Sequence, residues 1–173
     1  MGSTVAGKLL VSHPDRLLSV TFGGGGPAIN LSKAFNELME ATAETLEQNK
    51  GMGPLVSALM PAGGPKLNPE LAGAMSKLAL GDNDQKSLAA VIRGQKELVV
   101  TEAQLKANKV PVQFVYGSQE SDLVKERVTE LKKALPDAPF KVVDKGDHRS
   151  TVASPEFHAA VPAVLEFVRR HGR

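Results

Sequence analysis

A histidine and two carboxylates that follow predicted strands carry the strongest chemical signal in the sequence. The stretch VDKGDHRS (143–150) places His148 two residues after the glycine at which a β-branched run stops. The stretch GSQESD (117–122) places Glu120 and Asp122 after an earlier apolar run. A carboxylate can orient an imidazole and stabilise its protonated form, which leaves the other ring nitrogen to act on a nucleophile. Taken singly, these residues are better explained as helix caps and a hydrogen-bonded loop histidine, but their placement at matching strand ends favours an acid–histidine pair.

Three short apolar runs predict the strands that position this pair: LLSVTFGG (17–24), VPVQFVYGS (110–118) and FKVVDKG (140–146). Apolar residues at helical spacing precede the first run, separate the second from the third, and follow the third from Pro155 to Val168. Near-continuous apolar strands that alternate with amphipathic helices indicate the α/β class with a parallel sheet. In such sheets, ligands and catalytic groups lie beyond the carboxyl ends of the strands. We therefore expect the loops after these three runs to form the site.

The long segment between the first two strands has a different character. Residues 27–108 contain several helical patterns, punctuated by glycine and proline, and no strand signal. We predict an α/β core from residues 1–26 and 109–173, and a helical cap or lid from 27–108. Expected substrate-binding residues are two glycines after the first strand and three apolar residues of the cap: Gly24, Gly25, Leu55, Leu59 and Met60. Such apolar residues are more often only core or subunit contacts.

Composition narrows the range of partners. The 173 residues carry a net charge of +2 with no basic stripe among aromatic residues, so we expect no nucleic acid partner. No apolar run approaches the roughly 18 residues of a membrane span, and no signal-peptide pattern is present. The chain has no cysteine and only four dispersed histidines, so we expect no metal and no organic cofactor. These features suit a cytoplasmic protein.

The order of these segments resembles the C-terminal half of the α/β-hydrolases, including bacterial esterases. KLLVSHPDRLLSVTFGGGGP is similar to the segment that follows the family's nucleophile elbow, and VPVQFVYGSQESDLV is similar to its acid-bearing strand and loop. VVDKGDHRSTVASPEFHAAVPAVLEFVRRH resembles the catalytic-histidine loop and last helix, and NDQKSLAAVIRGQKEL resembles a cap helix. The resemblance implies a truncated hydrolase-type sheet of about three strands with a helical cap. It also implies hydrolysis of a small carboxylic ester, with His148 as the general base.

Two departures from the family pattern concern the catalytic residues. The family usually has aspartate where this chain has Glu120, a role that Glu120 or Asp122 can fill. Its G-x-S-x-G elbow would place the serine just before Met1, and the motif occurs nowhere else in the chain. Ser3 is the leading relocated nucleophile, because amides at a helix start can support an oxyanion, although it is at least equally a plain helix cap. Three other serines are weaker candidates: Ser118, Ser121 and Ser150.

Three hypotheses about the activity follow. The chain is a serine esterase with a relocated nucleophile, a non-catalytic hydrolase-like domain, or one half of a split hydrolase whose partner chain supplies the serine. In the parent fold the strand matching 17–24 pairs with the nucleophile-bearing strand, so here it should present an exposed edge. We therefore expect a homodimer or larger homo-oligomer, formed through this edge or through the cap helices.

Overall fold

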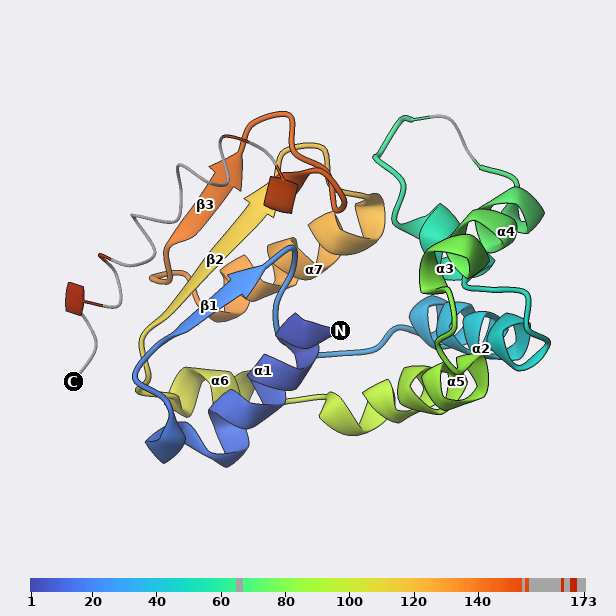
Figure 1. Ribbon diagram of the computed structural model, residues 1–173. Coiled ribbons are helices and arrows are strands. Elements are labelled where there is room, and N and C mark those ends of the chain that lie inside the picture. The colour runs from blue at the N-terminus through green and yellow to red at the C-terminus, as the bar shows by residue number, and fades with distance from the viewer. Residues whose placement is uncertain (65–66, 154, 156–165, 167–168, 171–173) are drawn as a thin grey trace.

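A parallel sheet of three strands organises the chain. A computed structural model describes residues 1–64, 67–153, 155, 166, 169 and 170 (Figure 1). Its strands are β1 (Val20–Gly23), β2 (Val112–Gly117) and β3 (Phe140–Val143), in the order β1-β2-β3 with both pairings parallel. This confirms the predicted α/β class with about three parallel strands. The helix predicted from Pro155 to Val168 falls almost entirely outside the described residues.

A ladder of three phenylalanines crosses one face of the sheet. The register pairs Phe22 with Phe114 and Phe114 with Phe140, so their side chains point the same way. The rings stack with centroids 5.0 Å and 4.4 Å apart. Three helices add leucines to the core around this ladder, namely α1 (Gly2–Ser12), α6 (Glu102–Ala107) and α7 (Asp122–Ala134), which supply Leu10, Leu105 and Leu131.

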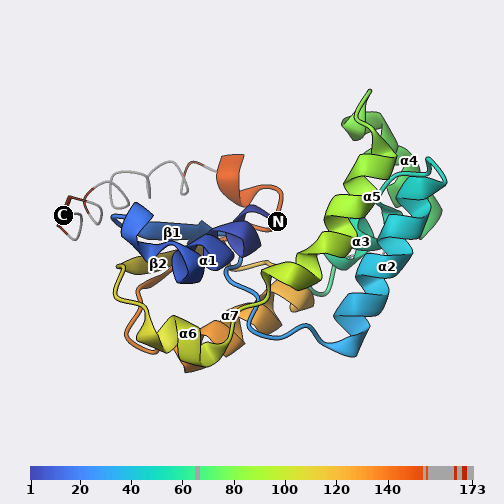
Figure 2. The same ribbon diagram turned by 90° about the horizontal axis from the view of Figure 1, so that it is seen from below.

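The helices α2 to α5 form a separate helical unit beside this α/β body (Figure 2). They span Lys33–Glu47, Gly53–Ala58, Pro69–Leu80 and Gln85–Gly94. The apolar stripe of α2 faces α5, and the core of the unit comprises Phe35, Met39, Ala43, Leu46, Ala89 and Ile92. On the surface of the same helix pair, Arg93 bonds both Glu40 and Glu47. The predicted cap, residues 27–108, also includes α6, whose Leu105 packs in the core of the body. The division at residues 27 and 108 stays a prediction.

Helix starts follow local capping chemistry. The side chains of Ser32, Asn68, Asp84 and Thr101 each accept a hydrogen bond from an amide in the first turn of the helix that follows. Within the described ranges no helix is both long and apolar enough to cross a bilayer.

One edge of the sheet is open along β1. The amides of Val20 and Gly24 donate to Pro111 and Val115 on the β2 side, both at 2.9 Å. In a parallel strand the residues between them, Thr21 and Gly23, direct their backbone groups to the opposite side. The described residues place no strand there.

The phenylalanine ladder predicts where stability is concentrated. Phe114 is 1% exposed and contacts both neighbouring rings, so Phe114→Ala should lower the free energy of unfolding by about 3–5 kcal/mol in urea titrations. Leu78→Ala removes an apolar side chain that is 85% exposed and should change it by less than about 0.5 kcal/mol. Similar losses in the two variants would contradict this account of the core.

Candidate active site

Glu120 and His148 lie in contact beyond the carboxyl ends of β2 and β3. Nδ1 of His148 is 3.1 Å from Oε2 of Glu120. The Glu120 side chain is 0% exposed, whereas that of His148 is 33% exposed. The second carboxylate oxygen accepts a longer bond, 3.4 Å, from the Gly117 amide. With a proton on Nδ1 the ring donates to the carboxylate, and Nε2, which bonds no described residue, is left as a base.

Two glycines allow the acid loop and the histidine loop to meet. A Cβ on Gly117 would lie 2.0 Å from the carbonyl oxygen of Gly146, so no larger residue fits at position 117. The amide of Gln119 donates to that same carbonyl at 2.8 Å, and the amide of Ser118 donates to Val143 at 2.9 Å. These backbone bonds fix the loop that carries Glu120 against the loop that carries the histidine.

The loop after β1 supplies the third side of the site. Gly24 has a left-handed φ of +63°, and a Cβ there would lie 3.2 Å from Cε1 of His148. The absence of a side chain therefore lets the backbone lie against the imidazole. Gly24 and Gly25 both line the cavity beside the ring, where the sequence placed them as candidate binding residues.

A turn built on Asp147 holds the histidine in place. Oδ1 of Asp147 accepts bonds from the amides of Arg149 and Ser150, at 2.9 and 2.6 Å, and from the Ser150 hydroxyl at 2.7 Å. These bonds, the Ser150 hydroxyl first among them, lower the pKa of Asp147. The turn encloses His148 on both sides in the chain, so it restricts the position of the ring.

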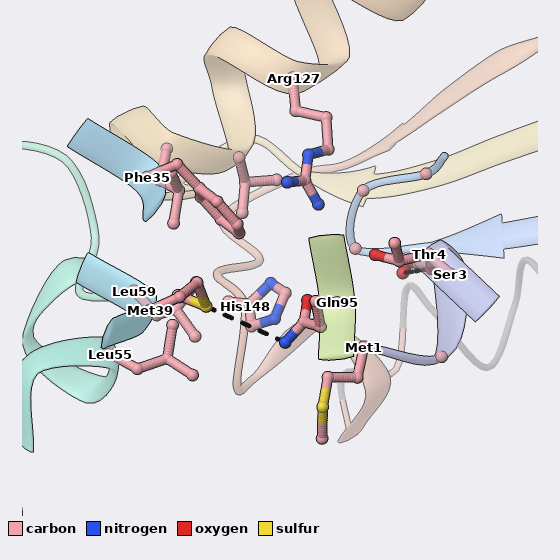
Figure 3. Close-up of a pocket in the computed structure, with 17 residues that line it drawn as sticks. Met1, Ser3, Thr4, Phe35, Met39, Leu55, Leu59, Gln95, Arg127 and His148 are labelled. Carbon is pink, nitrogen blue, oxygen red and sulfur yellow. Dashed lines mark hydrogen bonds between the residues drawn. The ribbon is translucent and has the colours of Figure 1, made fainter. Parts of the chain in front are cut away.

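The imidazole faces a cavity of about 250 Å³ between the body and the helical unit (Figure 3). The body contributes the start of α1, the glycine loop, His148 and part of α7. The helical unit contributes an apolar wall of Phe35, Met39, Leu55 and Leu59. Of the three expected cap residues, Leu55 and Leu59 line this cavity and Met60 is not among its lining residues; their role in binding stays a prediction.

The structure separates the two candidate acids. Asp122 is the first residue of α7, is exposed, and lies with Lys125 and Glu126 in a different surface hollow. Of the pair, only Glu120 contacts the histidine.

Of the four candidate serines, the structure places only Ser3 among the described residues of the cavity. Ser118 accepts a bond from the amide of Lys145, Ser121 caps α7, and Ser150 bonds Asp147. Ser3 lines the cavity at the start of α1, next to Thr4 (Figure 3), and its hydroxyl donates to the carbonyl of Gly23 at 2.8 Å. No hydrogen bond joins Ser3 to His148 in the part of the chain that the structure describes.

Sequence reasoning missed Arg127 and Gln95, which also line the cavity. Arg127 lies four residues after Leu123 and three after Val124, both of which line the same cavity from α7. A cationic residue on the apolar side of a predicted helix was the available signal. Burial lowers the pKa of the Arg127 guanidinium, and the nearby Glu130 partly offsets this.

The described residues contain no group of three or more His, Asp or Glu placed to hold a metal ion.

Comparison with known proteins identifies the architecture. No family model and no curated protein matches the sequence. Among solved structures, a carboxylesterase of the thaumarchaeon Nitrososphaera gargenis is similar over 98% of this chain and 63% of its own, with a TM-score of 0.68 and 17% identity. Esterase E22 is similar over 96% of this chain and 58% of its own, with a TM-score of 0.70 and 14% identity.

A third solved hydrolase structure shares the same architecture. The 2-hydroxy-6-oxo-6-phenylhexa-2,4-dienoate hydrolase of Rhodococcus sp. strain RHA1 is similar over 98% of this chain and 61% of its own, with a TM-score of 0.59 and 22% identity. The chain therefore has a partial α/β-hydrolase fold, as the resemblance implied, and it spans about 60% of the length of these structures.

The turn at Asp147 gives a pH-dependent prediction. Its pKa is lowered by folding, so its contribution to stability is complete above the ordinary aspartate pKa of about 3.9 and is lost as the pH falls through the lower folded value. Asp147→Ala should lower the free energy of unfolding by about 1 kcal/mol at pH 7, and the difference from the parent should shrink below about pH 4. Chemical denaturation at pH 7 and pH 3 measures this. Asp144→Ala removes a neighbouring carboxylate that accepts only one 3.5 Å bond from Ser118, and it should have a smaller effect at pH 7.

Proposed function

We propose that this chain hydrolyses a carboxylic ester and that His148 is its general base. The observation that carries the proposal is the 3.1 Å contact between the His148 ring and the buried Glu120 carboxylate, at the edge of a cavity with an apolar wall. The likeness to solved esterases supports it through the fold. An apolar wall suits an acyl chain, and a volume near 250 Å³ suits a short one.

In the proposed reaction, Nε2 of His148 takes the proton of an attacking hydroxyl while a bond forms between that oxygen and the ester carbonyl carbon. Glu120 stabilises the imidazolium that results. The tetrahedral intermediate then expels the alcohol, which leaves with the proton held on Nε2. Water attacks the acyl-enzyme by the same route, releases the carboxylic acid and restores the hydroxyl.

The start of α1 is the proposed source of both the nucleophile and the oxyanion support. Among the described residues that line the cavity, Ser3 and Thr4 carry the hydroxyl groups. Ser3 is our candidate nucleophile. Its hydroxyl must leave the Gly23 carbonyl before it reaches His148. The amides of Gly2 and Ser3 bond to no described group, so they are free to stabilise a negative oxygen at the positive end of the helix dipole.

A matched set of variants tests this assignment. Hydrolysis of 4-nitrophenyl butyrate should fall at least about 100-fold in His148→Ala, because proton transfer loses its base. Ser3→Ala should abolish both hydrolysis and covalent labelling by a fluorophosphonate, mapped by mass spectrometry of peptides. Ser12→Ala, which removes a hydroxyl at the other end of the same helix, should change neither.

The possible outcomes separate the hypotheses. Equal rates in all variants would contradict catalysis and favour a non-catalytic hydrolase-like domain. A loss of activity in His148→Ala but not in Ser3→Ala would keep the hydrolase and remove Ser3 as its nucleophile.

The open edge of β1 favours a second candidate, in which a further chain completes the site. Thr21 and Gly23 direct their backbone groups away from β2, and an unpaired edge of this kind is a template for another strand. We propose that a second copy of the chain pairs here. A different polypeptide that co-purifies and brings a reactive serine would instead favour the split hydrolase.

A single proline tests edge pairing without breaking the sheet. Thr21→Pro removes an amide that faces the open edge and leaves the amides that bond β2. Sedimentation at micromolar concentration should show a dimer or larger species for the parent chain and a monomer for Thr21→Pro. Thr21→Val also loses the 2.9 Å bond from Gln113 but keeps the edge amide, so it should assemble like the parent. A monomeric parent chain would overturn the proposal.

A further inference from the structure

Arg127 places an uncompensated positive charge in the cavity of the candidate site. Its side chain reaches from α7 into the space that His148 and Gln95 also face (Figure 3). Cζ lies 5.1 Å from the centroid of the Phe35 ring, and this contact holds the guanidinium beside the apolar wall. Among the described residues no hydrogen bond or ion pair reaches the guanidinium.

The contrast with Arg93 shows what a structural arginine in this chain does. Arg93 bonds two carboxylates, Glu40 and Glu47, across α2 and α5. Among the described carboxylates, only Glu130 acts on Arg127, from its own helix and beyond ion-pair distance, and the Met1 amine beside it is another cation. A guanidinium carries five donors, and holding it half-buried without an acceptor is unfavourable. A bound anion would supply the missing acceptors.

The remaining walls of the cavity leave this charge for a ligand. No aspartate or glutamate is among the described residues that line the cavity, and the nearest acid of the site, Glu120, is fully buried and already bonds His148. Gln95 offers a second donor, because within the described part of the chain its carboxamide nitrogen bonds only the thioether sulfur of Met39, at 3.9 Å. A thioether is a weak acceptor, so this nitrogen can turn to a better one.

We propose that the substrate carries a carboxylate, bound by Arg127 with help from Gln95, while its ester carbonyl faces His148. Arginine suits this role because its planar fork matches the two oxygens of a carboxylate. The substrate class is then a monoester of a dicarboxylic acid, with the free acid at the end of the acyl chain. The ester part of this inference rests on the proposed function; the carboxylate site does not.

A pair of esters matched in shape tests the charge. 4-Nitrophenyl hydrogen adipate ends in a carboxylate, and 4-nitrophenyl 6-methylheptanoate ends in an isopropyl group of similar size. The parent chain should have a kcat/KM at least about 10-fold higher for the adipate. Arg127→Met should lower kcat/KM for the adipate about 10- to 100-fold and leave that for the neutral ester within about 3-fold, whereas Arg127→Lys should retain part of the preference. Arg16→Met, an exposed arginine outside the cavity, should match the parent.

A binding measurement keeps the carboxylate site testable if neither ester is cleaved. Hexanoate, added to ¹⁵N-labelled protein, should shift the side-chain Nε–H signal of Arg127 in a saturable manner, and hexanamide should not. Arg127→Met should bind hexanoate at least 10-fold more weakly, while Arg16→Met, at an exposed site outside the cavity, should bind it like the parent.

Each result decides one of the two proposals. Hexanoate binding without ester cleavage would support the carboxylate site and remove the proposed function. Ester cleavage without a preference for the adipate, or an equal loss for both esters in Arg127→Met, would overturn the carboxylate site and leave the hydrolase. Absence of a hexanoate shift at Arg127 would overturn it as well.

Discussion

The Glu120 carboxylate has no exposed surface, and a carboxylate in that position must find its partners inside the protein. Removing such a charge from water costs several kcal/mol, which only close, well-oriented donors offset. Here those donors are the His148 ring and the Gly117 amide, so they come from the loop after β3 and from the end of β2. The two strand ends must therefore meet, which explains why the backbone at Gly117 leaves no room for a Cβ. The acid–histidine contact and the close approach of the loops after β2 and β3 therefore depend on each other.

The cavity exists because two different cores meet beside this contact. Leu123 of α7 packs on the core of the helical unit, while Leu59 of that unit packs on Tyr116, Val124 and Val128 of the body. These reciprocal apolar contacts hold the helical wall over the imidazole. The result is a cavity that is apolar on the helical side and polar on the body side. Arg127 of the body lies where the two sides meet, with its charge next to Phe35 of the apolar wall, and this position is the basis of the proposed anionic ligand.

The strands could be predicted from the sequence because buried parallel strands are continuous apolar runs. The predicted ends of the strands differ from the observed ends because of the local backbone geometry. β1 begins at Val20 rather than Leu17 because the Leu17 amide closes the preceding 3₁₀ turn on Pro14. β3 ends at Val143 because Lys145 has a left-handed φ of 55° and the chain turns back there.

The site could be predicted only in part. The sequence offered Glu120 and Asp122 equally, since both follow β2. The choice depends on where α7 begins: Asp122 is its first residue and points to solvent, whereas Glu120 precedes the Ser121 cap and turns inward. The sequence likewise did not show that Met60 lies outside the cavity or that Arg127 lines it. Which side of a short helix or loop faces a cavity depends on packing between the body and the helical unit. The hydrophobic periodicity of a single segment does not predict that packing.

The Gly23 carbonyl connects the two proposals, edge pairing along β1 and Ser3 as the nucleophile. It faces the open edge of β1, and it accepts a hydrogen bond from the Ser3 hydroxyl. A strand that paired along this edge would use the same carbonyl as an acceptor. The Ser3 hydroxyl would then share or lose its partner, within the cavity that His148 faces and one residue from the glycine that contacts the ring. The two proposed sources of a nucleophile, Ser3 and a serine from a second chain, are therefore coupled. Pairing at the edge would change the hydrogen bond between the Ser3 hydroxyl and the Gly23 carbonyl, whether or not the incoming strand carries a hydroxyl of its own.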